Sequence, residues 1–279
     1  MNIDLSQASR IALGTAEMSR FNMGDAFWQK VIKLPEGGTI SYANIEGIDY
    51  RIHTFLGNGQ FKTYKSMDLE YFVVGEGGTG AVNKSSLPRG GGAGGDVVHN
   101  LGSPINMTAK TYSIIVGSGT TGNQKTGRSS SFDNIATAYG GGGARTGGVG
   151  GSNSLWSGGQ GSGLLDGSVS GGGGAGAGGP GTNGEDWTGE VREGAPGGPG
   201  ILANPDGNPR YFGVGGNGNG GGSDASQAPT LAAGSGAGSP GRKVAGSATA
   251  VPPGSGCVII RYPAEDAPVF EKKSQGFTA

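Results

Sequence analysis

Short apolar runs along the chain predict a set of β-strands. Between residues 48 and 74, the segments IDYRIHTF, QFKTYK and LEYFVV are rich in β-branched and aromatic residues, and a turn signal at 57–59 separates the first two. Further strands are expected at 111–116, 131–137 and 257–262. The runs YFVV, YSIIV and CVIIRY are almost continuously apolar, which is typical of strands buried on both faces of a sheet. If LEYFVV and CVIIRY share a sheet, the long segment between them has its two ends pinned together.

The first 33 residues contain a small internal repeat. SRIALGTAEM (9–18) and SRFNMGDAFW (19–28) align at a period of ten, and each copy reads as a strand, a turn at Gly-Thr or Gly-Asp, and a second strand. Two copies are too few for a solenoid, so a small β-hairpin layer is expected. So short a layer cannot bury all its apolar residues by itself, and we expect a larger partner to cover them. The candidate attachment residues are Ile11, Leu13, Phe21, Met23, Phe27 and Trp28.

Glycine dominates the middle of the chain. Of the 64 glycines, 56 lie between residues 75 and 256. Glycine and proline together make 78 of 279 residues, a share that is common in disordered chains. A net charge of only −1 argues against disorder, because disordered chains usually combine low hydrophobicity with high net charge. Composition therefore allows either a flexible linker or an ordered body, and the pinned ends favour order.

An ordered body needs a structure that glycine runs can form. Collagen requires glycine at every third position, and GGGGAGAGGPGTNG (171–184) keeps no such register. Silk-like stacked strands are disfavoured because the runs are short and lack strand-forming residues. Polyproline II helices have three residues per turn and no internal hydrogen bonds, so they can bond laterally to one another. Since glycine has no Cβ, such helices can pack with their backbones almost in contact, and we expect a packed array of them.

The order of strands and glycine runs resembles a known family. LEYFVVGEGGTG, TYSIIVGSGTTG, SSSFDNIATAYGGGGA and a closing GSGCVIIRYP follow one another as in the glycine-rich domain of tailed-bacteriophage tail fibres and adhesins. The similarity covers about residues 50–263. It implies a small β-sandwich joined to stacked polyproline-II-like glycine helices, of the polyglycine II type. It also implies that loops between the glycine helices recognise a receptor on the host surface.

With this resemblance, the chain is expected to be mostly β with irregular segments. The predicted organisation is a β-repeat attachment segment at 1–33, a glycine-rich body with flanking strands at 34–263, and a C-terminal tail at 264–279. The body should hold the small β-sandwich and the packed array of glycine-rich polyproline-II-like helices.

No motif in the sequence points to catalysis or to a bound cofactor or metal. In GTTGNQKTG (119–127), Lys125 lies three residues past Gly122, whereas a P-loop needs the lysine directly after the glycine. The nucleophile elbow G-x-S-x-G does not occur. Of the two histidines, His53 lies within the strand pattern YRIHTF and is expected to be a strand residue. A single cysteine, Cys257, excludes both an internal disulfide and a zinc site built on cysteines.

Charge and hydropathy argue against secretion, membrane insertion and nucleic-acid binding. The start, MNIDLSQASR, carries an acidic residue and no apolar run, so no secretory signal is expected. No stretch approaches the roughly 18 apolar residues of a membrane span. A pI near 6.1 argues against a nucleic-acid partner, which would require clustered Lys and Arg. Together with the resemblance, these features predict a protein made in the host cytoplasm and carried on the virion.

The leading functional hypothesis is a phage tail-fibre or adhesin subunit. It would join other virion proteins through residues 1–33 and bind a host-surface protein or polysaccharide through loops at the far end. Hot spots favour Trp, Tyr and Arg, and the receptor-binding candidates are Trp187, Trp156, Tyr211, Phe212 and Arg210. Each ring could instead shield the end of the glycine helices from water. The alternatives are a purely structural virion component (neck, baseplate or capsid decoration) and, third, a capsule depolymerase that uses paired carboxylates.

Overall fold

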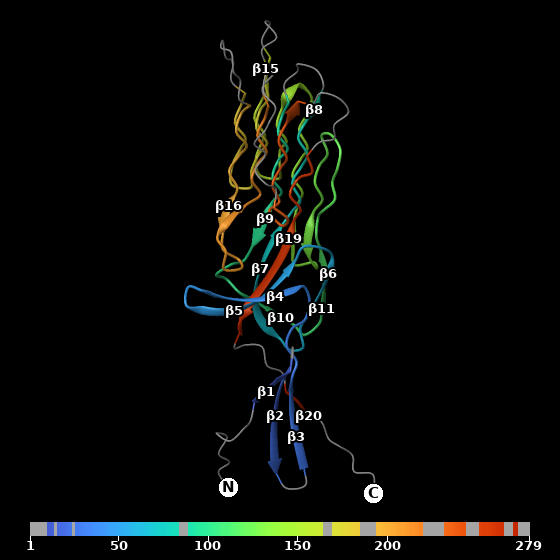
Figure 1. Cartoon of the computed structure of the whole chain (residues 1–279), viewed down its shortest axis with the longest axis vertical. Coiled ribbons are helices and arrows are strands. Elements are labelled where there is room, and N and C mark those ends of the chain that lie inside the picture. Colours follow the sequence, from blue (N-terminus) through green and yellow to red (C-terminus); the bar gives the residue numbers. More distant parts are fainter. Residues whose placement is uncertain are drawn as a thin grey trace.

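The structure, a computed structural model, describes residues 10–13, 16–23, 26–83, 89–163, 169–184, 194–219, 232–243, 251–264 and 270–272. Three parts follow one another along the long axis of the molecule: a four-stranded sheet, two packed sheets, and an array of glycine-rich helices (Figure 1). Within the described ranges, no helix is long and apolar enough to cross a membrane.

The four-stranded sheet at one end, which we call the head sheet, contains the sequence repeat. Its strands run antiparallel in the order β1 (Arg10–Leu13), β2 (Ala16–Met23), β3 (Ala26–Ile32) and β20 (Phe270–Lys272). Ser19 of β2 pairs with Arg10 of β1 on one side and with Lys30 of β3 on the other, so the predicted hairpin layer is confirmed. β20 pairs with β3, which places part of the expected tail 264–279 in the head sheet. The three residues of β20 are too few for a readable strand pattern.

A six-stranded sheet forms the centre of the molecule. Its strands are β4 (Thr39–Ile45), β5 (Ile48–Phe55), β7 (Met67–Val74), β9 (Val97–His99), β10 (Ile105–Met107) and β19 (Cys257–Pro263). β19 lies between β7 and β5, and Val258 pairs with both Val73 and Phe55. LEYFVV and CVIIRY therefore share a sheet, as the sequence suggested. Almost every residue of these two strands is buried, in agreement with the predicted burial on both faces.

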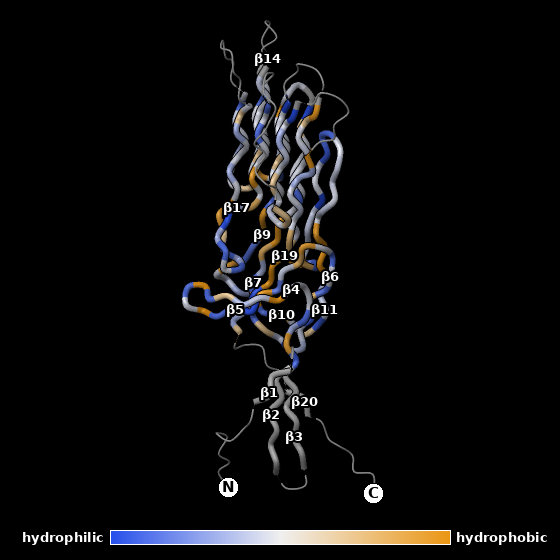
Figure 2. The backbone as a smooth tube through the Cα atoms, in the orientation of Figure 1, coloured by the Kyte–Doolittle hydropathy of each residue, from blue (hydrophilic) through white to orange (hydrophobic). Residues whose placement is uncertain are grey.

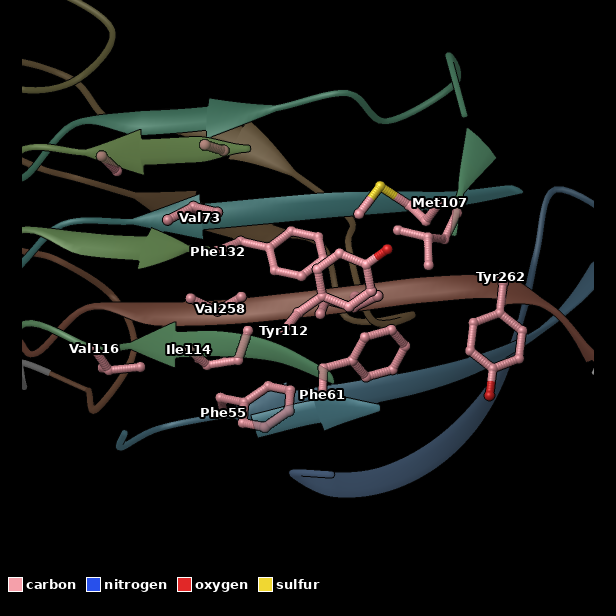
Figure 3. Packing of buried hydrophobic residues seen from close by; sticks show 14 of the residues in the cluster. Phe55, Phe61, Val73, Met107, Tyr112, Ile114, Val116, Phe132, Val258 and Tyr262 are labelled. Atoms are coloured by element: carbon pink, nitrogen blue, oxygen red, sulfur yellow. The ribbon is translucent and has the colours of Figure 1, made fainter. Parts of the chain in front are cut away.

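A second sheet covers one face of the first. It consists of β6 (Gly59–Lys62), β11 (Thr111–Ile115), β12 (Ser130–Phe132) and β13 (Ala136–Ala138), in the order β13-β12-β11-β6. Phe61, Tyr112 and Phe132 pack between the two sheets against Val73 and Val258 (Figure 3). This aromatic layer forms the core of the predicted small β-sandwich.

Two of the strand predictions for this second sheet are wrong in detail. The YSIIV run was expected to be buried on both faces, but β11 alternates between buried and exposed residues because only one face of its sheet is covered. The single strand expected at 131–137 is a hairpin of β12 and β13. Asp133 lies in its turn with φ of +47°, a left-handed conformation that Asp tolerates better than most residues.

The other face of the six-stranded sheet carries a second apolar cluster. Tyr50, Ile52, Phe72, Ile259 and Phe212 belong to it, and Phe72 meets Phe212 edge-to-face at 4.7 Å between ring centroids. Phe212 comes from the glycine-rich region, so this cluster joins the array to the sandwich. Cys257 lies in the same cluster, and burial raises the pKa of its thiol to about 12.

His53 is a buried strand residue of β5, as expected from the sequence. Its Nδ1 lies 2.7 Å from the Gly37 carbonyl oxygen and its Nε2 lies 3.1 Å from the Tyr262 hydroxyl. Phe61 packs edge-to-face on the ring. Burial, assisted by the positive charge of Arg51, lowers the pKa of His53 to about 4.

This depressed pKa predicts a loss of stability in mild acid. The unfolded chain binds a proton at His53 below about pH 6.5, whereas the folded chain resists it until about pH 4. The free energy of unfolding should therefore fall by about 3 kcal/mol from this residue as pH drops from 7.5 to 4. Urea unfolding at both pH values, in the wild type and in His53→Gln, measures the effect. An equal pH dependence in the two proteins would contradict the assignment.

Candidate functional site

The glycine runs form helices that bond to one another laterally. The run 89–96 lies at the centre of one such group. Its amides donate to three neighbouring runs in turn, with a repeat of three residues: Gly91 to Gly172, Gly92 to Ser239, Ala93 to Gly142, Gly94 to Ala175, Gly95 to Gly236 and Asp96 to Tyr139. Its carbonyls accept from three more runs: Gly90 from Ala81, Gly91 from Gly151 and Gly92 from Gly216. Six neighbours at a period of three are what laterally packed polyproline II helices require.

A second central helix, 169–176, repeats this arrangement. Its amides donate to three runs: Gly171 to Asn219, Gly172 to Gly148 and Gly173 to Thr182. Its carbonyls accept from three others: Gly171 from Ala195, Gly172 from Gly91 and Gly173 from Gly159. The two central helices are thus direct neighbours in a hexagonal array, and the predicted packed array is confirmed.

Close backbone contact explains why these positions are glycine. A Cβ added at Gly91 would overlap the backbone of Gly216, and one added at Gly94 would overlap Gly213. Figure 2 shows the result: the array is mostly near the middle of the hydropathy scale, while apolar residues gather around β7, β9 and β19. The array is therefore held by backbone hydrogen bonds and backbone packing, with few apolar side chains.

Loops occur at both ends of the array. At the far end lie β8 (Val82–Asn83) with β18 (Arg242–Lys243), and β14 (Ser162–Gly163) with β15 (Val169–Ser170) (Figure 1). At the base, next to the sandwich, the chain turns at 152–156, at 176–179 and in the hairpin of β16 (Ile201–Ala203) and β17 (Arg210–Phe212). The 152–156 loop is placed there by Asp96, which directly precedes β9 and accepts from the Ser154 amide.

Trp156 occupies one of these base loops. Asn153 Oδ1 accepts from the amides of Leu155 and Trp156, which fixes the turn, and its Nδ2 donates to the Gly176 carbonyl. The indole Nε1 donates to the Ala177 carbonyl at 3.2 Å, while 41% of the residue stays exposed. The ring is thus held in one orientation and presents a free face to solvent. Its position differs from the expected one, because it lies at the base and not at the end far from the head sheet.

Tyr211, Phe212 and Arg210 lie in strand β17, whereas loops were expected. Because neighbouring residues of a strand belong to opposite faces, Tyr211 is 58% exposed and Phe212 is fully buried against Phe72. The prediction that Phe212 binds a receptor is therefore wrong. Its ring is instead packed in the apolar cluster between β17 and the six-stranded sheet. Arg210 makes two hydrogen bonds to Asp206, of 2.8 and 2.9 Å, and lies over the Phe212 ring at 4.5 Å, so it stiffens the hairpin.

Three exposed apolar residues beside these candidates were missed from the sequence. Leu202 pairs directly with Tyr211 across the hairpin, Leu155 precedes Trp156, and the Tyr139 carbonyl accepts from the Asp96 amide. All three are more than half exposed. We call the set of five the basal belt: Tyr139, Leu155, Trp156, Leu202 and Tyr211. The proximity of Leu202 to Tyr211 depends on strand register, which the glycine-rich sequence around them does not reveal.

The belt follows a chain of hydrogen bonds around the base of the array. Asp96 joins the Tyr139 backbone to the 152–156 loop. The Ala177 carbonyl accepts from Trp156, and the Ala177 amide donates to Gly213, which directly follows β17. The belt residues therefore lie on separate loops and one hairpin, which hydrogen bonds join to the backbone of the array.

The remaining candidates can be placed only in part. Trp187 lies outside the described residues. For the attachment candidates the structure gives strand positions in the head sheet: Ile11 and Leu13 in β1, Phe21 and Met23 in β2, and Phe27 and Trp28 in β3. Phe21 pairs directly with Trp28.

Comparison with known proteins places the chain in one family. No curated protein and no solved structure matches it. A family described as a glycine-rich domain matches residues 56–263, which cover most of the sandwich and the whole array. Because the matched span is well over half of its length, the chain belongs to this glycine-rich domain family.

Proposed function

We propose that this protein is a bacteriophage virion protein, a tail-fibre or adhesin subunit that binds the host cell surface through loops between its glycine helices. The observation that carries the proposal is the basal belt, in which exposed aromatic and leucine side chains lie on loops and on the β16–β17 hairpin at the base of the glycine-helix array. Preorganised loops lose little entropy on binding, and Trp and Tyr are common binding hot spots. The ligand would be a surface protein or polysaccharide of the host.

The arrangement along the long axis supports attachment through the head sheet. Both the first and the last described strands, β1 and β20, lie at one end, and the array lies at the other (Figure 1). Fixing the head sheet to other virion proteins would point the array and its loops away from the particle. In this proposal Trp187 stays a further receptor-binding candidate.

We propose a binding role and not a catalytic one. A depolymerase would need one carboxyl group kept protonated at neutral pH beside an ionised one. In the described part of the chain, Glu46, Asp68 and Glu70 line one cavity together. Glu70 is ion-paired with Arg261, and Glu46 and Asp68 are exposed to water, so none of them has the surroundings of a general acid.

Removing two of the three belt rings, Trp156 and Tyr211, tests the binding role. Trp156→Ala with Tyr211→Ala should lower the adsorption rate of virions to host cells by about tenfold or more, as expected for two hot-spot residues. Adsorption is measured from unbound particles over time, together with the melting temperature of the purified variant. Trp187→Ala should act in the same direction.

The matched control is Ile115→Ala, since Ile115 is equally exposed but lies on β11, outside the belt. It should leave adsorption unchanged. If the double variant is incorporated, melts like the wild type and adsorbs normally, the purely structural virion role is favoured instead.

A further inference from the structure

Two neighbouring helices, 178–184 and 194–200, form one flank of the glycine array, which we call the proline flank. They bond to each other through the Thr182 amide, which donates to the Pro196 carbonyl at 3.2 Å. Helix 194–200 also bonds to the central helix 169–176 and to the run that follows β17. Three neighbours are half of the six that surround a central helix, so the other side of helix 194–200 faces outward.

The amides of helix 194–200 follow the three-residue repeat of the array. Ala195 and Gly198, three residues apart, both donate inward to the central helix, at 3.0 and 2.7 Å. The Gly197 amide, in a second direction, donates to Asn217 Oδ1 at 2.9 Å. A side-chain oxygen thus takes the place that a carbonyl of another helix would have there.

Proline occupies the third direction of this helix. With three residues per turn, the amides of positions 196 and 199 would point to a side where no run of the described residues bonds to the helix. Pro196 and Pro199 lie at these two positions, and both are exposed. Because proline has no amide hydrogen, the helix has no free backbone donor on that side.

Helix 178–184 carries an exposed proline, Pro180, in the equivalent direction. Its other two directions are used by amides that donate to neighbouring runs: Gly181 to Ser157, Gly184 to Gln160 and Thr182 to Pro196. Asn183 Oδ1 of the same helix accepts from the Gln160 amide at 2.7 Å, which is a second side-chain cap. The proline flank therefore has prolines and capped amides where plain glycine runs would present free donors.

An edge of such an array without these residues would be a template for further helices. The edge strand of a β-sheet is the nearest parallel, because its unpaired N–H and C=O groups pair with strands of other chains unless proline or charge blocks them. Glycine helices bond laterally through the same groups, and each copy of this chain contains many such helices.

We propose that the prolines of this flank prevent the array from adding a glycine helix of a second copy of the chain. Pro196 and Pro199 cannot donate to an incoming carbonyl, and their rings keep another backbone at a distance. The Asn217 cap withdraws the Gly197 amide in the same way, since that donor is already bonded. The array is thereby kept finite, although its interior consists of helices that bond to their own kind.

Restoring the two amides tests the proposal. Pro196→Gly with Pro199→Gly removes no hydrogen bond of the array, so the full chain should fold. It should associate with itself about tenfold or more above the wild type, since two restored donors of ordinary strength suffice for that. Sedimentation equilibrium over a range of concentrations measures the association. Amide hydrogen exchange should show the restored amides at 196 and 199 protected in the associated form.

The matched control is Pro104→Gly with Pro209→Gly, since both prolines are exposed but lie in loops outside the array. It should associate no more than the wild type. Pro180→Gly is a second variant, which opens the neighbouring helix alone and should strengthen association by a smaller factor. If a folded flank variant associates no more than the control, the proposal is overturned. Failure of both flank variants to fold would also overturn it, because the prolines would then support the helices themselves.

Discussion

Gly173→Val should destabilise the array by several kcal/mol and lower the melting temperature of the whole chain. Gly173 lies in the central helix 169–176, where its amide donates to Thr182 and its carbonyl accepts from Gly159, at 2.9 and 2.8 Å. A Cβ at this position would overlap the backbone carbonyl of Pro196 in a third helix. That carbonyl is itself bonded to the Thr182 amide, so the neighbour cannot move away without breaking the lattice.

Thermal and urea unfolding of the purified variants measure this effect. Gly57→Val is the matched control, because a Cβ there meets no atom within 4 Å and Gly57 has no left-handed φ. It should change the free energy of unfolding by less than about 1 kcal/mol. If Gly173→Val has the same melting temperature as the wild type, close packing at this helix is refuted.

The sequence predicted the type of helix in the array and the central strands of the sandwich, but not which glycine helices are neighbours. Composition and the lack of any collagen register led to polyproline-II-like helices, and the apolar runs at 48–55, 69–74 and 257–262 led to the central strands. Which helix lies beside which could not be predicted, because a glycine run has no side-chain pattern that marks its neighbours. The neighbours of the two central helices are defined by their hydrogen bonds alone.

The candidate site divides in the same way. Trp156 and Tyr211 were selected by residue type, which identifies rings suited to binding but not their direction. Phe212 follows Tyr211 directly, and the alternation of a strand turns one ring outward and the other into the core. The glycine-rich surroundings gave no sign that residues 201–203 and 210–212 pair as a hairpin. Leu202 was missed for that reason.

Deleting residues 1–33 should leave a folded body that no longer joins the virion. The strands of the head sheet pair only with one another in the described structure, while Leu34 already packs against the sandwich core. The sandwich and the array therefore keep their own contacts when the chain begins at Leu34. Near-normal melting of this truncated chain, with near-complete loss from purified particles, is the expected result. Its incorporation at the wild-type level would refute attachment through the head sheet.

A pair of point variants separates loss of the apolar residues from loss of the whole segment. Phe21 and Trp28 are directly opposite in the register of β2 and β3, and the next pair along is Arg20 with Gln29. Phe21→Ser with Trp28→Ser should sharply reduce incorporation, because an apolar partner surface would lose its contacts. Arg20→Ser with Gln29→Ser changes the adjacent polar pair to the same residue and should leave incorporation intact. Equal incorporation of the two double variants would mean that apolar docking is not what attaches the head sheet.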